Sequence, residues 1–255
     1  MRQPLPDPRR ALSPWPTPPE QLSLEVNDVH IWRASLEQSP ATVAQLRPLL
    51  SPDEQSRADR FHFERDRRHF TTARAYLRTL LGTYLGMTPQ EIRFSYTEFG
   101  KPALALELNQ QLKFNLAHSG GLALYGFTRI GEIGIDLEYI RPEFTGREIA
   151  DRFFSRMEVA SLNQLPKTER HQAFFNCWTR KEAFIKAKGL GLSLGLDQFD
   201  VTLAPEQAAA LLQTRWDEKE AARWSLMAIE AGPEYAAAVA LEAHDWQPSY
   251  WEVNT

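Results

Sequence analysis

The order of secondary-structure signals constrains the fold of this chain more than any other feature of its sequence. An alternating segment at 28–36, helical segments between 51 and 86, and short strand-like segments from 91 to 129 form one round of strand, helices and strands. The same order returns from residue 130 to residue 243. A repeated order of this kind predicts an α+β protein made of two similar halves, with the join near residue 130.

Both halves carry clear helix-start signals. Ser51 and Glu54 form a capping-box pattern with proline at the first helical position, and Ser155 with Glu158 forms a second one. Each of these two patterns precedes a longer helix. The first long helix is expected to end near Gly86, and the second is expected over 172–189. We expect these long helices to pack an apolar stripe on a sheet.

Four short segments are alternating or apolar and are separated by turns that contain glycine: 91–102, 112–119, 122–129 and 130–140. They predict a strand meander on one antiparallel sheet. The expected organisation is a proline-rich leader, an N-terminal half, a C-terminal half and a C-terminal tail, at 1–20, 21–130, 131–245 and 246–255. Seven prolines in the first nineteen residues favour an extended leader, and no apolar signal-peptide segment precedes it.

The composition is that of an ordinary globular protein, with 43% hydrophobic and 24% charged residues. The net charge of −4 counts against a general nucleic-acid binder, which would be basic. The single cysteine, Cys177, fits a reducing compartment and is expected to be a buried structural thiol. No apolar run reaches the roughly 18 residues of a membrane-spanning helix. We therefore expect a cytoplasmic protein that binds neither nucleic acid nor membranes.

The strand-like sequence IGIDLE places Asp136 and Glu138 two residues apart. Because side chains alternate along a strand, both carboxylates leave the same face, about 6.6 Å apart. The pair would repel unless a cation lay beside it. The simpler interpretation is two solvated acids at the end of an edge strand.

A third acid, Glu182, lies on the core-facing stripe of the helix over 172–189. A buried carboxylate needs a partner. Lys186, one turn further on, could supply an ordinary helix ion pair. Alternatively, the three carboxylates could converge on one hard divalent cation, since oxygen ligands suit Mg²⁺ and a phosphate substrate. Lys181 or Lys186 would then neutralise phosphate charge.

Basic side chains occur in three further motifs. NLAHSGG places His118 at a turn where glycines let a ligand approach the backbone, and GKP places Lys101 in a tight turn. The ordinary interpretations are a polar hairpin and a surface lysine. From Arg57 to Arg78, seven arginines accompany three acids. This excess indicates either a solvated helix face or a surface for an anionic ligand or partner.

Several of these motifs together resemble a known family. IGIDLE and WTRKEAFIKAKG are similar to the two signatures of the 4′-phosphopantetheinyl transferases, (I/V)-G-(I/V)-D-x-E and W/F-(S/C/T)-x-K-E-(A/S)-x-x-K. EFGKP, FNLAHSG and RFHFERDRRHFTTARAYLR resemble the motifs that precede them in the double-length type that activates surfactin synthetase. The likeness covers residues from about 50 to 203.

The resemblance implies a pseudo-dimeric α+β fold in which each half packs an antiparallel sheet on a long helix, with the active site between the halves. It implies a monomeric, Mg²⁺-dependent transferase of the holo-[acyl-carrier-protein] synthase type. Such an enzyme transfers the phosphopantetheine arm of coenzyme A to a serine of apo acyl or peptidyl carrier proteins and releases adenosine 3′,5′-bisphosphate. These carriers serve fatty-acid, polyketide or nonribosomal-peptide synthesis.

The resemblance also implies residue roles. The implied Mg²⁺ ligands are Asp136, Glu138 and Glu182. The side chains implied to bind the coenzyme phosphates are Lys101, His118, Lys181 and Lys186. Arg57 would serve the 3′-phosphate, because Glu54 stands where some relatives have a basic residue. Glu182 and Lys186 would be catalytic, the first accepting the serine proton and the second stabilising the departing bisphosphate.

One departure and two rival functions accompany this interpretation. Ala117 replaces a serine that some relatives have beside the histidine, which removes one possible phosphate hydrogen bond. The first rival is another Mg²⁺-dependent phosphotransferase, although the sequence contains no Walker-type glycine-rich loop. The second is a non-catalytic coenzyme-A-binding scaffold, which would be expected to lose one of the acids or the lysine.

Overall fold

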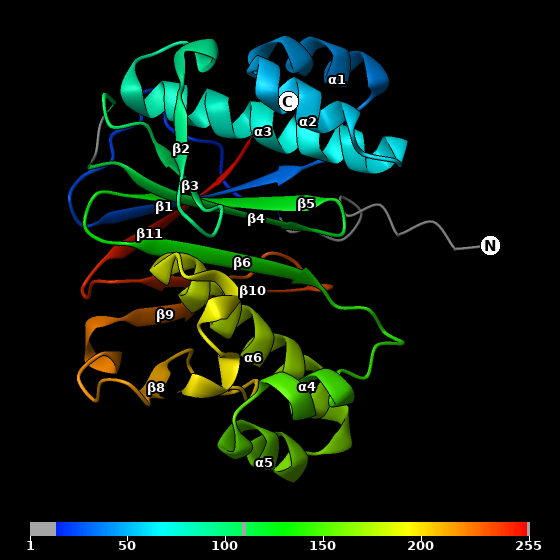
Figure 1. The fold of residues 1–255 in the computed structure, drawn as a ribbon, viewed down its shortest axis with the longest axis vertical. Coiled ribbons are helices and arrows are strands. Elements are labelled where there is room, and N and C mark those ends of the chain that lie inside the picture. Colours follow the sequence, from blue (N-terminus) through cyan, green and yellow to red (C-terminus); the bar gives the residue numbers. More distant parts are fainter. Residues whose placement is uncertain (1–13, 109–110, 254–255) are drawn as a thin grey trace.

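The computed structural model describes residues 14–108 and 111–253, and its core consists of two sheets lying face to face (Figure 1). The first sheet has the strand order β11 (Gln247–Glu252), β1 (Asp28–Ser35), β5 (Leu122–Thr128), β4 (Lys113–Ser119). The second has the order β6 (Ile133–Tyr139), β10 (Tyr235–Leu241), β9 (Ser225–Ala228). Two small pairs stand apart from them: β2 (Phe94–Tyr96) with β3 (Pro102–Leu104), and β7 (Phe199–Val201) with β8 (Leu211–Thr214).

Helices cover the outer face of each sheet. The helices over the first sheet are α1 (Pro40–Leu46), α2 (Pro52–Asp59) and α3 (Glu64–Leu85). Those over the second are α4 (Arg147–Phe153), α5 (Arg156–Gln164) and α6 (Lys167–Lys188). The layers therefore run helix, sheet, sheet, helix, as Figure 1 shows, and the predicted α+β class is confirmed.

Three apolar clusters hold these layers together, each large side chain in them contributing about 1.5–3 kcal/mol by its burial. The cluster between α3 and the first sheet includes Leu77, Leu81, Tyr125 and Phe127. The cluster around α6 includes Phe174, Phe184, Ala183 and Ala238. The cluster between the two sheets includes Ile31, Leu124, Ile133, Ile135, Leu137 and Val239. Because side chains alternate along β6, the residues between its isoleucines and leucine face α6 instead.

The two long helices are built alike. Both α3 and α6 have 22 residues, and each ends at a glycine in the left-handed conformation, Gly86 with φ 65° and Gly189 with φ 69°. Glycine adopts this conformation without steric cost. The short helices α2 and α5 that precede them both begin with the predicted capping boxes. The two halves thus share one structural plan.

The predicted single-sheet meander is wrong at its first and last segments. β4 and β5 are paired, but β6 pairs with β10 along its whole length in the other sheet, and β2 and β3 form a separate pair. The link at 129–132 carries the chain from one sheet to the other. The alternating pattern of 130–140 predicts a strand, but it does not specify which strand will be the hydrogen-bonding partner.

The segment 246–255, expected to be a tail outside both halves, instead contains β11. This strand runs parallel to β1, with Trp251 opposite Trp32. Residues 1–13 of the expected leader at 1–20 lie outside the described residues. Beyond that point, Trp15 packs edge-on against Tyr250 and Pro16 O accepts a hydrogen bond from the Glu252 N–H. Within the described part of the chain, no helix has the length and apolar character needed to cross a membrane.

Candidate active site

β6 approaches α6 closely at a glycine. A β carbon at Gly134 would collide with the backbone of Ala183 and Ala187 in α6. The glycine of IGIDLE therefore lets the strand lie directly against the helix. Asp136, two residues further along the same face, is thereby brought to the side chains of α6.

Asp136 is buried beside Lys186. Its side chain is 6% exposed, and its Oδ1 accepts a hydrogen bond from Lys186 Nζ at 2.5 Å. Its Oδ2 is buried without a hydrogen-bond partner, the only carboxylate oxygen in that condition among the described side chains. A charged oxygen cut off from both water and donors is costly, by more than about 1 kcal/mol. This position therefore favours a bound cation.

Glu138 and Glu182 share the electrostatic environment of Asp136. Burial, followed by the negative charge of Asp136, raises the pKa of both glutamates, and Lys186 partly opposes this effect. Burial alone would lower the pKa of Lys186, but Asp136 and the two glutamates together raise it, so the lysine carries its charge. Lys186 thus bonds to Asp136, in place of the simple helix ion pair with Glu182.

The three acids do not form a complete metal cage by themselves. Across 14–108 and 111–253, no three carboxylate, histidine or cysteine side chains are gathered as a ready metal centre. Mg²⁺ commonly takes only one or two carboxylates and completes its shell with water and substrate phosphates. The oxygen donors and the unpartnered Oδ2 of Asp136 suit such an ion.

A crevice of about 290 Å³ lies beside these acids, between the two halves. Its walls come from the turn at 99–102 and β4 on one side, and from α6 with the glycine turn at 189–191 on the other. The α6 residues that line it are Glu182, Ile185 and Lys186. At the end of β4, His118 reaches solvent. Desolvation by surrounding protein, then the charges of Lys186 and His69, lower the pKa of His118, which favours a neutral imidazole.

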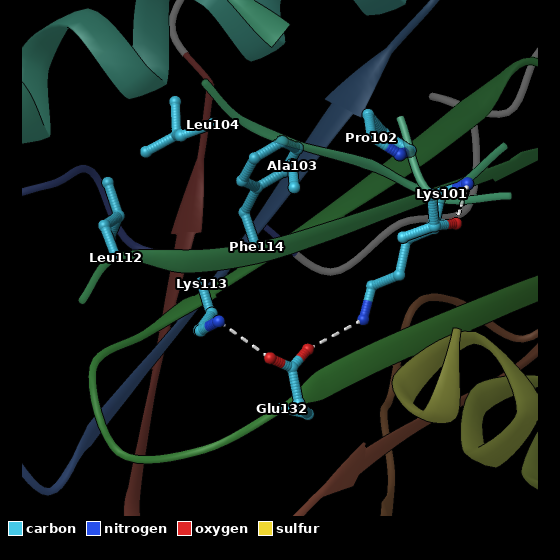
Figure 2. A pocket seen from close by; sticks show the side chains of 9 residues that line it. Lys101, Pro102, Ala103, Leu104, Leu112, Lys113, Phe114 and Glu132 are labelled. Carbon is cyan, nitrogen blue, oxygen red and sulfur yellow. Dashed lines mark hydrogen bonds and ion pairs between the residues drawn. The ribbon is translucent and has the colours of Figure 1, made fainter. Parts of the chain in front are cut away.

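Lys101 lines the crevice, but its ammonium group is already engaged. It donates to Glu132 Oε2 at 3.2 Å, to Ile133 O at 3.2 Å and to Ala187 O at 3.0 Å. Figure 2 shows Glu132 held between Lys101 and Lys113. An ammonium has three donors, and all three are used here. The structure therefore gives Lys101 a role in joining the halves, and the expected phosphate contact is not supported by these bonds.

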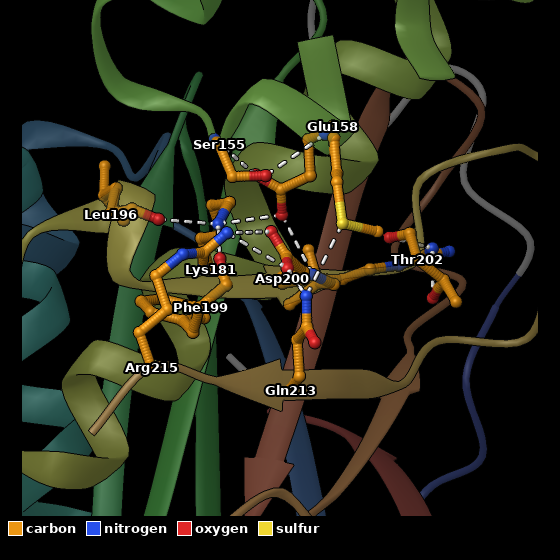
Figure 3. Close-up of polar contacts among 12 residues, drawn as sticks. Ser155, Glu158, Lys181, Leu196, Phe199, Asp200, Thr202, Gln213 and Arg215 are labelled. Carbon is orange, nitrogen blue, oxygen red and sulfur yellow. Dashed lines mark hydrogen bonds and ion pairs between the residues drawn. The ribbon is translucent and has the colours of Figure 1, made fainter. Parts of the chain in front are cut away.

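Lys181 points away from the three acids. It is fully buried, with Glu158 Oε1 at 2.8 Å, and it donates to Leu196 O at 2.7 Å and Phe199 O at 2.6 Å (Figure 3). Adjacent helix residues point about 100° apart, so Lys181 and Glu182 face different surroundings. The structure does not bring Lys181 to the place where the expected phosphate contact would occur.

The first half contains the same arrangement with an arginine. Arg78 donates to Glu54 at 2.5 Å and to two backbone carbonyls, those of Pro89 and Ile92, at 2.9 Å each. Arg78 and Lys181 both stand eight residues before the glycine that ends their helix. In both halves, the glutamate of the capping box in the short helix forms a buried ion pair with a basic side chain of the long helix. This symmetry identifies Lys181 as a structural residue.

The duplication does not extend to the acidic site. The positions of Glu182 and Lys186, counted back from the glycine that ends α6, are occupied in α3 by Thr79 and Thr83. Only the second long helix therefore carries the acid and the lysine. The fold is therefore duplicated, whereas the candidate site occurs only in the second of the two described halves.

Arg57 and Glu54 lie apart from the acidic group. Arg57 is exposed on α2, with its guanidinium 5.3 Å from the centre of the Phe70 ring. Glu54 is buried and paired with Arg74 and Arg78, so part of the basic segment is structural. The capping box in the sequence predicted the local bond of Glu54 to the Ser51 N–H, but its burial between two arginines comes from the packing of α3.

Cys177 is buried, and burial raises its pKa well above the ordinary value, which confirms the expected structural thiol.

Ser119, which the sequence interpretation did not select, donates its hydroxyl to Glu138 Oε2 at 3.0 Å. A signal was present in the alternation of β4, which places Ser119 and Asn115 on one face.

Comparison with known proteins gives consistent matches. Residues 132–240 match the 4′-phosphopantetheinyl transferase superfamily, and residues 30–126 match the family described as 4′-phosphopantetheinyl transferase, N-terminal. The chain is 39% identical over 238 residues to the 4′-phosphopantetheinyl transferase HetI of Nostoc sp., covering 93% of this chain and 97% of HetI. It is 36% identical over 154 residues to the 4′-phosphopantetheinyl transferase Sfp of Bacillus subtilis, covering 60% of this chain and 66% of Sfp.

Proposed function

The chain belongs to the 4′-phosphopantetheinyl transferase superfamily, and on this premise we propose that Asp136, Glu138, Glu182 and Lys186 form its active site. The protein is a 4′-phosphopantetheinyl transferase, which moves the phosphopantetheine arm of coenzyme A to a serine of an apo carrier protein. The observation that supports this site most strongly is the buried, unpartnered oxygen of Asp136 beside two further acids.

The cofactor we propose is Mg²⁺, held by Asp136, Glu138 and Glu182. When bound, the ion would neutralise pyrophosphate charge and draw electron density from the β-phosphorus. The ion would be the positive partner that Asp136 Oδ2 lacks, and it would relieve the repulsion that contributes to the raised pKa of the two glutamates.

The transfer exchanges one oxygen for another at phosphorus. The serine oxygen bonds to the β-phosphorus of coenzyme A, while the bond from that phosphorus to the bridging oxygen breaks, and adenosine 3′,5′-bisphosphate departs with the bridging oxygen. Glu182, which lines the crevice beside Lys186, accepts the serine proton as general base. Lys186, which keeps its charge, stabilises the departing bisphosphate. His118, as a neutral imidazole, donates one N–H to a phosphate oxygen.

The crevice between the halves is the proposed coenzyme site, with the aliphatic part of Lys101 in its wall. Arg57, exposed on α2, is the proposed contact for the 3′-phosphate. The halves at 21–130 and 131–245 each supply one wall. One chain therefore holds the full set of residues, and we propose that it works as a monomer. The cytoplasm is the proposed location, since a reducing compartment suits the single free Cys177.

The test is incubation of the protein with coenzyme A, Mg²⁺ and an apo carrier, followed by mass spectrometry. The expected result is a carrier heavier by one phosphopantetheinyl group, release of adenosine 3′,5′-bisphosphate, and loss of both when EDTA removes the metal. Transfer of a phosphoryl group alone would favour a different phosphotransferase. Tight coenzyme binding with no turnover on a panel of carriers would favour the scaffold.

A further inference from the structure

The two sheets meet at a pair of edge strands that share no backbone ladder in the described structure. β4 is the last strand of the first sheet and β6 the first strand of the second. Backbone groups of alternate residues in β6 point toward β4, and buried backbone groups need partners. Side chains from the first half provide them.

Three such bonds follow one another along β6. Lys101 Nζ donates to Ile133 O at 3.2 Å. The Ile135 N–H donates to Asn115 Oδ1 at 2.9 Å, and the Tyr139 N–H donates to Ser119 Oγ at 3.1 Å. On β4 the residues involved lie on one face, where Lys113 also binds Glu132 at 2.8 Å and Ala117 fills the place between Asn115 and Ser119.

Joining strands by side chains has a geometric consequence. Backbone pairing would hold the strands about 4.8 Å apart, whereas a side chain placed between them keeps them further from each other. The crevice that adjoins the acidic group opens at this place, and Lys101 and Asn115 both line it. The same bonds therefore fix β6 and leave room beside it.

We infer that Lys101, Asn115 and Ser119 form a side-chain ladder that sets the position of β6, and with it that of Asp136 and Glu138. This inference rests on the proposed function, because it concerns the acids proposed to bind Mg²⁺. The positioning residue closest to them is Ser119. Its single hydroxyl accepts from the Tyr139 N–H and donates to Glu138 Oε2, so one atom fixes both the strand and the carboxylate.

The turn after Ser119 is itself held in place. Tyr235 donates its hydroxyl to Gly120 O at 2.9 Å, and a β carbon at Gly120 would press on the Tyr139 side chain. The turn therefore cannot shift along β6 without breaking contacts to β10. This rigidity is what a positioning residue requires.

The experiment compares the full-length wild type with Ser119→Ala, Ser119→Thr and the matched control Ser95→Ala. Ser95 also bonds through its hydroxyl, to Leu104 O, but on the separate β2–β3 pair. The measurements are amide hydrogen exchange at Tyr139, Mn²⁺ binding followed by electron paramagnetic resonance, and carrier modification. Exchange in α3 reports global stability in every variant.

For Ser119→Ala we expect about tenfold faster exchange at Tyr139, about tenfold weaker Mn²⁺ binding, and a lower kcat with the KM for coenzyme A within about twofold. Ser119→Thr, which keeps the hydroxyl, should recover most of each loss, and Ser95→Ala should match the wild type. Unchanged Tyr139 exchange and Mn²⁺ binding in Ser119→Ala would overturn the ladder. A wild type that binds no Mn²⁺ would instead overturn the proposed metal site, while Tyr139 exchange still reports on the ladder.

Discussion

Replacing Glu182 by glutamine should make the metal-free protein more stable while it removes most of its activity. Glu182 is half-buried, and burial together with the charge of Asp136 raises its pKa. An acid whose pKa is raised on folding stabilises the protein when protonated, below its unfolded pKa. That contribution is lost as the pH rises through the folded pKa. At pH 8 the ionised Glu182 therefore weakens the fold, and glutamine removes this weakness.

The magnitude follows from the neighbouring charges. At an effective dielectric constant near 20, neighbouring like charges repel by about 3 kcal/mol. Lys186 opposes much of this repulsion. The net gain expected for Glu182→Gln is about 1 kcal/mol, or a Tm higher by about 2–4 °C for a chain of this size. Loss of the proton acceptor should lower kcat by about 10²- to 10⁴-fold.

The assay is thermal unfolding at pH 5 and pH 8, with EDTA or Mg²⁺, beside carrier modification followed by mass spectrometry. The gain in Tm should be larger at pH 8 than at pH 5, and added Mg²⁺ should stabilise the wild type more than the variant. Glu169→Gln, in the first turn of the same helix, is the control: it should leave carrier modification unchanged and, because it removes a favourable helix-dipole charge, should not raise the Tm. A Glu182→Gln protein that turns over at the wild-type rate, or that is less stable than the wild type at pH 8 without metal, would refute the reasoning.

Three further substitutions test other parts of the structure. Lys181→Met leaves Glu158 without its buried cation and should lower the free energy of unfolding by about 3 kcal/mol, while the folded fraction keeps its kcat; urea unfolding and single-turnover transfer measure both. Gly134→Ala should separate β6 from α6, with a loss of about 3 kcal/mol in urea unfolding and of turnover; a stable, active variant would contradict the close approach. Lys186→Met leaves Asp136 uncompensated and should lower kcat at least about tenfold. Glu138 and Glu182, whose pKa values are raised, are more fully ionised at pH 8 than at pH 5, so the metal-free Tm of this variant should fall more at pH 8. Equal losses at both pH values would contradict the electrostatic coupling of Lys186 to these acids.

The duplicated plan and the local arrangement of the site residues could be predicted from the sequence. Capping boxes and helix-ending glycines depend on neighbouring residues alone, and they appear where expected in both halves. The spacing of Asp136 and Glu138 places both on one face of any strand. The glycine of the same motif is explained by the contact with α6, which is a tertiary fact.

The roles of the lysines were decided by tertiary structure. Lys181 and Lys186 both adjoin Glu182 in the helical motif, and the pattern treats them alike. The fold covers the Lys181 side of α6 with Glu158 and the carbonyls of Leu196 and Phe199, and it covers the Lys186 side with Asp136. Periodicity specifies the direction in which a side chain leaves its helix, but the partner that it meets there depends on which distant segment packs against that face.

The same reason explains the position of β6 and the part played by Ser119. Alternation predicts a strand and the two faces of its side chains, yet hydrogen bonding along a strand edge is open to any partner. β10, a hundred residues later in the chain, takes one edge of β6, and side chains from β4 and the Lys101 turn take the other. The sequence by itself placed Asp136 and Glu138 on one face of a strand and Glu182 and Lys186 one turn apart on a helix. Packing between distant segments decided which side chains face the acidic group and which hold the two halves together.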